Sequence, residues 1–127
     1  MPGPAAAGVL LYAKNLDALA HFYEQVLGMK ELHRSAEIIV LESSVLQIVI
    51  HAIPAAIAAQ VHISSPPQRR ENVALKFFVT VPSMAQAQEA ATRLGGQVFD
   101  ESWQGPGFVV RNAMDCEGNV FQLRERL

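Results

Sequence analysis

The chain has 127 residues, of which 50% are hydrophobic and 17% are charged, and its formal net charge at pH 7 is -2. This length suits one domain, or two small modules that share a core, and the composition excludes intrinsic disorder. The near-neutral charge, with no run of Lys or Arg, argues against binding to nucleic acid or to an anionic membrane surface.

The single cysteine, Cys116, excludes an intramolecular disulfide and favours a reducing compartment. The N-terminal segment is apolar, lacks a basic n-region and continues directly into the first predicted strand, so we interpret it as mature protein rather than as a signal peptide. The apolar runs are too short to span a membrane. We therefore expect a cytoplasmic protein without a membrane partner.

The first half of the chain predicts a strand, a helix and three further strands. A run of branched apolar residues predicts the first strand over 8–13. A helix is expected over 16–27, because Asn15 suits its N-cap, its apolar residues share one face and Gly28 suits a left-handed C-cap. The three strands are expected over 30–34, 37–42 and 45–51.

A connector rich in proline and small residues separates the halves over 54–72, and it has room for one helical turn near 55–60. A strand over 74–80 then leads into a helix that Pro82 and Ser83 open. The remaining strands are expected near 97–102, 107–113 and 119–125, with a loop over 103–107.

The two halves repeat each other. Residues 8–28 and 74–95 each read as a strand, a polar turn and an amphipathic helix that ends in Leu-Gly, and residues 45–48 echo 120–123. We therefore predict one domain over 1–127 that contains two βαβββ modules, over 8–53 and 73–127. A duplicated half-domain commonly places its ligand site on the axis that relates the copies.

Two motifs carry a resemblance to a known family. Asn15-Leu16-Asp17 leads into Phe22-Tyr23-x-x-Val26-Leu27-Gly28, and the turn Asp115-Cys116-Glu117-Gly118-Asn119 precedes the last strand. The pattern resembles the vicinal oxygen chelate superfamily, which includes glyoxalases, extradiol dioxygenases, and fosfomycin- and bleomycin-resistance proteins; Cys116 stands where that family usually has proline. The resemblance implies an α+β fold, with two βαβββ modules forming a U-shaped half-barrel cup and the helices outside. It also implies a homodimer.

The metal enzymes of that superfamily take ligands from the first and last strands of each module. Carried over one at a time, these positions fall on Gly8, Gln47, Ala74 and Gln122. Divalent metals need imidazole, carboxylate or thiolate donors, and the four histidines of the chain lie elsewhere. We therefore expect no metal and no other cofactor.

Strand alternation predicts which side chains line the cup. Val9, Leu11, Ala13, Leu75, Phe77 and Val79 should pack on the helices. The candidate ligand-binding residues, on the strands and on the loop over 103–107, are Tyr12, Gln47, His51, Lys76, Phe78, Trp103, Phe108, Gln122 and Arg124. No constellation of catalytic residues is apparent, so we predict none.

Each candidate also has a structural interpretation. Gln47 and Gln122 either bind a ligand or hydrogen-bond to each other or to a buried water. His51 is either an acid or base or a structural residue, since no Asp or Cys partner is visible. Lys76 binds an anion, acts as a base, or pairs with a carboxylate at the rim.

Arg124 is either a substrate clamp or a rim residue that pairs with Glu101 or Glu125. Tyr12 and Phe78 either stack on a flat ligand or belong to the core. Trp103, with Phe108, is either a mobile lid or a surface tryptophan at a dimer interface.

The leading hypothesis is a protein that sequesters or senses an aromatic or otherwise flat small molecule without metal chemistry. The alternative is a glyoxalase-like lyase, isomerase or dioxygenase-type enzyme with an atypical site. A third possibility is an interaction module that has kept the fold and lost the site.

Overall fold

The computed structural model describes residues 4–127. The first module comprises β1 (Gly8–Ala13), α1 (Leu16–Leu27), β2 (Lys30–Arg34), β3 (Ile38–Glu42) and β4 (Gln47–Ala52). The short α2 (Ala55–Ala58) lies in the connector. The second module comprises β5 (Phe78–Thr80), α3 (Met84–Arg93), β6 (Gln97–Gly105), β7 (Phe108–Met114) and β8 (Val120–Arg126).

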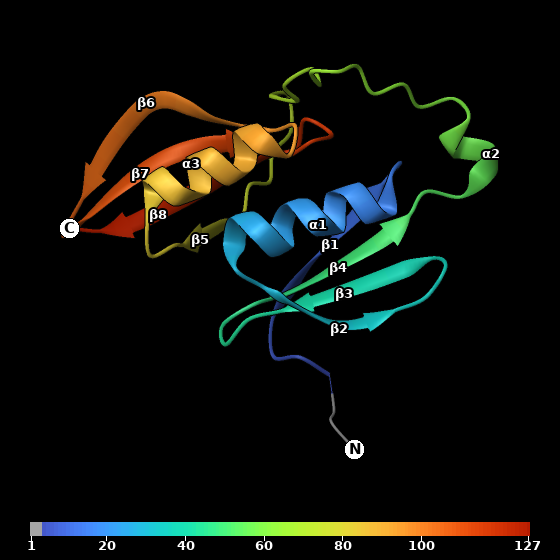
Figure 1. Cartoon of the computed structure of the whole chain (residues 1–127), viewed down its shortest axis with the longest axis horizontal. Helices are drawn as coiled ribbons and strands as arrows, with labels where there is room; N and C mark the ends of the chain where they lie inside the picture. The colour runs from blue at the N-terminus through green and yellow to red at the C-terminus, as the bar shows by residue number, and fades with distance from the viewer. Residues whose placement is uncertain (1–3) are drawn as a thin grey trace.

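The repeat predicted from the sequence is confirmed by the topology. Sheet one has the strand order β1-β4-β3-β2 and sheet two has the order β5-β8-β7-β6, with the first and last strands of each module paired in parallel. Helices α1 and α3 lie side by side against the two sheets (Figure 1). The fold is thus two βαβββ modules that form an open half-barrel. No helix within residues 4–127 combines the length and apolarity needed to cross a membrane.

The ends of the helices are set by the residues that the sequence indicates. The side chain of Asn15 accepts a hydrogen bond from the N–H of Ala18 at 3.1 Å, which caps α1. Gly28 ends that helix in a left-handed conformation with φ 65°. Ser83 caps α3 in the same way, by accepting from the N–H of Gln86 at 3.1 Å.

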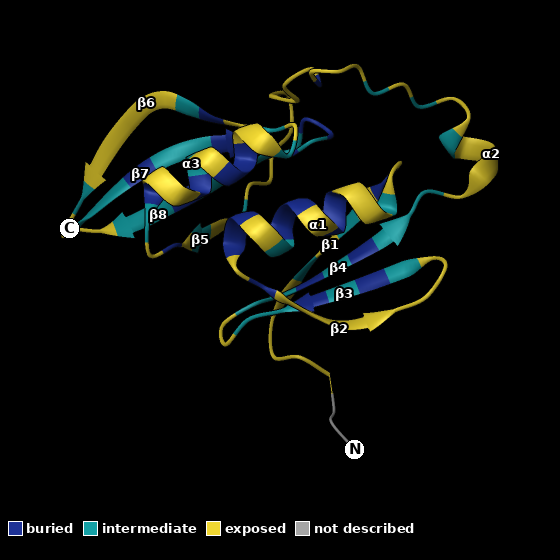
Figure 2. Ribbon diagram, viewed as in Figure 1, coloured by how far each residue is buried: buried dark blue, intermediate teal, exposed yellow. Residues whose placement is uncertain are grey.

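The core lies between the helices and the sheets, and it is continuous across both modules. Alternate residues in the middle of β3, β4 and β8 are buried against the helices, while the opposite faces keep partial exposure (Figure 2). Tyr23 of α1 packs edge-on against Phe121 of β8, with ring centroids 5.3 Å apart, and Phe77 stacks on Phe121 at 5.5 Å. These contacts join helix one of the first module to the sheet of the second.

The strand predicted over 74–80 is shorter than expected, because β5 begins only at Phe78. In the register of β5 and β8, a longer strand would continue onto Gly118. The carbonyl of Gly118 already accepts the N–H of Arg70 at 2.9 Å, so it is occupied by the connector. Leu75 was therefore wrongly expected to pack on the helix: 89% of it is exposed. Phe77 does pack on the core, as predicted.

The predicted loop over 103–107 is also wrong. Strand β6 extends to Gly105, and Trp103 pairs with Val110 of β7, so that only Pro106 and Gly107 form the turn. Trp103 therefore belongs to the edge strand β6, where it pairs with β7 alone, and not to a loop.

The turn Asp115–Asn119 joins the modules through two buried carboxylates. The carboxylate of Glu117 accepts the backbone N–H groups of Lys14 at 2.9 Å and Asn15 at 2.8 Å, where β1 passes into α1. The hydroxyl of Tyr23 donates to Asp115 at 2.6 Å. Burial raises the pKa of Asp115 although its hydrogen bonds act in the opposite direction, and burial likewise raises the pKa of Tyr23. The motif therefore has a structural role that the sequence analysis did not assign.

Candidate ligand-binding site

The face of sheet one that points away from α1 is open and partly aromatic. Tyr12 and Leu10 of β1 are 59% and 53% exposed, so Tyr12 is not a core residue. The rings of Tyr12 and His51 lie on neighbouring strands with centroids 5.7 Å apart. Gln47 lies on the same face, beside Gly8. The alternation predicted for these strands is thus confirmed.

His51 is held by a hydrogen bond between its Nδ1 and the carbonyl oxygen of Ala52, at 2.7 Å. A carbonyl oxygen only accepts, so Nδ1 carries the proton in this contact and Nε2 of the neutral ring is left as an acceptor. This geometry fixes the orientation of His51 beside Tyr12.

The corresponding face of sheet two carries a cluster built around Arg124, which we call the Arg124 cluster. Its members are Lys76, Phe78, Phe108, Asn112, Gln122 and Arg124. The guanidinium carbon of Arg124 lies 3.6 Å from the ring centroid of Phe78 and 5.2 Å from that of Phe108. Nε and Nη2 of Arg124 both donate to Oε1 of Gln122 at 3.1 Å. Stacking and hydrogen bonding together fix the plane of the guanidinium.

Arg124 does not pair with Glu125, contrary to one of the interpretations above. Successive residues of a strand point to opposite faces, so Glu125 lies on the helix side. There its carboxylate accepts the N–H of Met84 at 3.0 Å, at the start of α3. Glu101 is not a partner either: within residues 4–127, no ion pair involves Arg124.

Lys76 reaches the cluster from the segment before β5. Its Nζ donates to Oδ1 of Asn112 at 3.3 Å, and Asn112 lies opposite Gln122 in the register of β7 and β8. The carboxylate partner expected at the rim is absent from the ion pairs of the described chain. Asn112 was missed by the sequence analysis because its face follows from the register of β7, which the sequence alone does not define.

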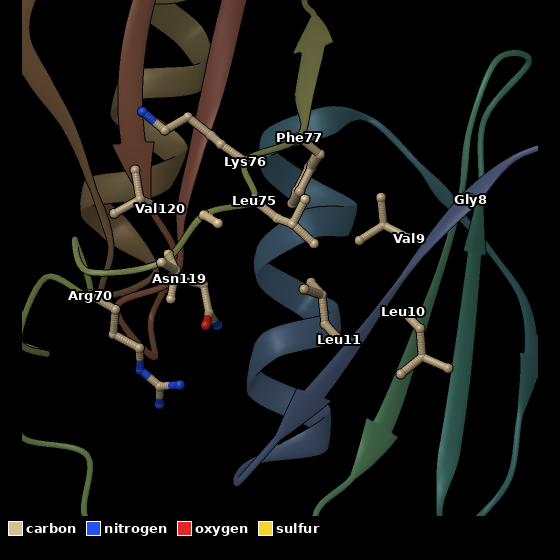
Figure 3. A pocket seen from close by; sticks show the side chains of 12 residues that line it. Gly8, Val9, Leu10, Leu11, Arg70, Leu75, Lys76, Phe77, Asn119 and Val120 are labelled. Carbon is tan, nitrogen blue, oxygen red and sulfur yellow. The ribbon is translucent and has the colours of Figure 1, made fainter.

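A groove of about 780 Å³ separates β1 from residues 73–77 (Figure 3). Val9, Leu11, Leu75 and Phe77 point into it. The other lining residues are Gly8, Leu10, Arg70, Val73, Ala74, Lys76, Asn119 and Val120. Of the nine predicted site residues, only Lys76 lines this groove, and its side chain turns away from it towards sheet two. The groove and the Arg124 cluster therefore adjoin at Lys76.

The other predicted residues are divided between the two sheets. Gln47 and Gln122 belong to different sheets, and no hydrogen bond joins them within residues 4–127, since the amide oxygen of Gln122 is used by Arg124. Trp103 lies across β7 from Arg124, in the same row through Val110, and it is 48% exposed. Phe108 packs over Gly105, where any larger side chain would collide with its ring.

The positions to which the resemblance assigns metal ligands do not offer a suitable donor set. Gly8 has no side chain, and a Cβ there would lie 2.6 Å from the carbonyl oxygen of Gln47. Ala74 has no donor atom, and Gln122 is engaged by Arg124. Neutral amides alone are poor ligands for a divalent metal. Elsewhere in residues 4–127, no three His, Cys, Asp or Glu side chains gather as a metal site.

Comparison with known proteins identifies the family. The model of a glyoxalase-like domain matches residues 8–124. No curated protein matches the chain. Similar solved structures include a glyoxalase/bleomycin resistance protein/dioxygenase family enzyme from Burkholderia phytofirmans, 19% identical, which aligns over 95% of this chain and 98% of that one with a TM-score of 0.71.

Two further structures agree in fold. A glyoxalase-related enzyme from Fulvimarina pelagi is 17% identical over 96% of this chain and 88% of that one, with a TM-score of 0.67. The fosfomycin resistance protein FosX from Listeria monocytogenes is 15% identical over 100% of this chain and 96% of that one, with a TM-score of 0.66. At these identities the likeness establishes the fold. With the family model covering nearly the whole chain, the protein belongs to the glyoxalase-like family of the vicinal oxygen chelate superfamily.

Proposed function

We propose that this protein binds a small aromatic or otherwise flat molecule on the open faces of its two sheets, and that it sequesters or senses that molecule without a resident metal. The observation that carries the proposal is the exposure of large aromatic side chains beside fixed polar groups. Tyr12, Phe78 and Trp103 are 59%, 53% and 48% exposed. Apolar surface of this kind, with a few oriented polar groups, is typical of small-molecule sites.

The single tryptophan supplies the test, because Trp103 lies on the proposed binding face. Its fluorescence should change on titration with aromatic compounds, and Phe78→Ala should weaken the binding of any active compound at least tenfold. Ile57→Ala removes an equally exposed apolar side chain from α2, outside the site, and should leave binding unchanged. A panel of neutral and charged aromatic compounds that leaves Trp103 fluorescence and protein stability unchanged would contradict the proposal.

The alternative is a glyoxalase-like lyase, isomerase or dioxygenase-type activity. Membership of the family favours it, together with the oriented His51, whose Nε2 is left as an acceptor beside Tyr12. Metal analysis of untagged protein, with a thermal-shift panel of Zn²⁺, Ni²⁺, Mn²⁺, Fe²⁺ and Mg²⁺, separates the two. We expect neither bound metal nor a shift; a stoichiometric metal would favour the enzyme.

We also propose a cytoplasmic homodimer. Leu75 and Val73, beside the free edge of β1, are 89% and 61% exposed, and a second copy would cover them. Light scattering after size exclusion should give a dimer mass, and Leu75→Lys should shift it towards the monomer. A monomer at all concentrations would refute the pairing.

A further inference from the structure

We infer that the ligand of this site carries an oxyanion, and specifically a carboxylate, which binds to the guanidinium of Arg124 with Lys76 as the second cation. This inference rests on the proposed function, since it names the chemical class of the molecule that the open face binds. It starts from the two cations of the Arg124 cluster. Neither forms an ion pair with any Asp or Glu in the described chain.

The hydrogen bonds of Arg124 decide which of its N–H groups remain for a ligand. Gln122 takes the edge formed by Nε and Nη2, because both atoms donate to its one amide oxygen. The opposite edge, formed by Nη1 and the second hydrogen of Nη2, keeps two nearly parallel N–H groups. Such a pair matches the two oxygens of a carboxylate. No protein atom accepts from this edge among the hydrogen bonds of residues 4–127.

The guanidinium is also prepared for this role by its neighbours. Its face stacks on Phe78 at 3.6 Å, which limits rotation and reduces the conformational entropy lost on binding. Arg124 is only partly exposed, so its interaction with an anion is screened less than at a fully solvated surface. Gln122 contributes a neutral oxygen that orients the cation without neutralising it.

Lys76 extends the positive field along the same face. Its Nζ is bonded to the neutral oxygen of Asn112, which leaves two N–H groups and the full charge. Glu125, the carboxylate nearest to Arg124 in sequence, is on the helix side of β8, where it accepts the N–H of Met84 at the start of α3. By strand alternation Arg126 of β8 lies on the same face and adds a third cation, and the hydrogen-bonding partners of Lys76 and Arg124 on this face are uncharged amides.

The test compares three probes that share a phenyl ring: benzoate, its neutral counterpart benzamide, and phenylphosphonate. Binding is followed by chemical-shift titration of the ¹⁵N-labelled full chain, including the Nε–H signal of Arg124 and the indole of Trp103. We expect benzoate to bind at least tenfold more tightly than benzamide and more tightly than phenylphosphonate.

Four variants locate the preference. Arg124→Gln should abolish the preference for benzoate over benzamide, Arg124→Lys should retain only part of it, and Lys76→Gln should reduce it several-fold. Arg93→Gln, which removes an exposed cation from the last turn of α3, should leave it unchanged. Amide spectra that match those of the unaltered protein away from the site establish that each variant is folded.

The outcomes separate this inference from the function on which it rests. If benzamide binds as tightly as benzoate, or if Arg124→Gln keeps the preference, the anion assignment is overturned while small-molecule binding stands. If phenylphosphonate binds more tightly than benzoate, the carboxylate assignment is overturned. If none of the probes shifts signals of the open face, both the inference and the proposed function fail for aromatic ligands.

Discussion

Replacing Glu117 with alanine should lower the free energy of unfolding by about 3 kcal/mol. The carboxylate of Glu117 accepts two backbone hydrogen bonds, and each hydrogen bond to a charged group contributes roughly 1.5–3 kcal/mol. Because both bonds share one carboxylate, their contributions do not add in full. Glu117 is only 4% exposed, and its two backbone partners, Lys14 and Asn15, belong to the other module. Alanine would leave both N–H groups without their acceptor at the junction of β1 and α1. Water that enters the gap would offset part of the loss.

Glu117→Gln offers a graded version of the same change. The amide keeps one oxygen of similar shape but loses the charge and one acceptor, so we expect about half of the loss, near 1.5 kcal/mol. Urea unfolding measures both variants: with an m-value of about 2 kcal/mol/M, the midpoint of the alanine variant should fall by about 1.5 M.

Glu89→Ala is the matched control, because Glu89 is exposed on α3 and its loss should change stability by less than about 0.5 kcal/mol. The reasoning is refuted if Glu117→Ala is no more destabilising than Glu89→Ala. If probes in the two modules report different losses of stability in Glu117→Ala, the modules no longer unfold together, and the turn is then what couples them.

Four other outcomes follow from the structure. The pKa of Cys116 is raised to about 12 by burial, so its alkylation by iodoacetamide at pH 8 should be slower than in urea by about three orders of magnitude. Tyr23→Phe removes the bond to Asp115 and should lower the free energy of unfolding by about 1–3 kcal/mol, whereas Tyr12→Phe, at an exposed ring, should leave it nearly unchanged in thermal unfolding. The folded-state pKa of Asp115 is raised by burial, so ionisation disfavours the folded state. Relative to Asp115→Asn, the protein should therefore lose stability as pH rises from about 4 through the folded pKa, as measured by unfolding across pH. Gly8→Ala should cost about 1–3 kcal/mol in urea unfolding, because its Cβ would overlap the neighbouring strand.

The elements that the sequence predicts correctly are those that local interactions define. Asn15 and Gly28 delimit α1 through hydrogen bonds and backbone angles within a few residues of the helix ends, and α3 begins in the same way at Ser83. The errors occur where a residue that is distant in the sequence determines the start or end of an element. Strand β5 begins late because Arg70, from the connector, occupies the carbonyl of Gly118.

The site residues also divide into those that a local sequence pattern predicts and those that depend on a distant contact. Alternation placed Gln122 and Arg124 on one face of β8, and the same rule excludes Glu125 as a partner of Arg124. What alternation does not supply is the register of β7, and so the contact between Lys76 and Asn112 was not predicted. The loop assigned to Trp103 failed for a similar reason, since a Gly-Pro-Gly segment marks a turn without showing how far the flanking strands extend.

The residues at the positions that the resemblance assigns to metal ligands and the charge of the open face are both consistent with the proposed anion site. At the position where the resemblance assigns the last metal ligand, Gln122 instead orients the guanidinium of Arg124. A bound divalent cation beside Arg124 and Lys76 would meet like charges with no carboxylate between them, which Coulomb repulsion disfavours. For an oxyanion the same two side chains supply the positive charge that a metal would otherwise provide. Whether the open face binds a cation or an anion therefore discriminates between a metal-dependent enzyme and a metal-free binding protein. The fold does not, because both functions share it.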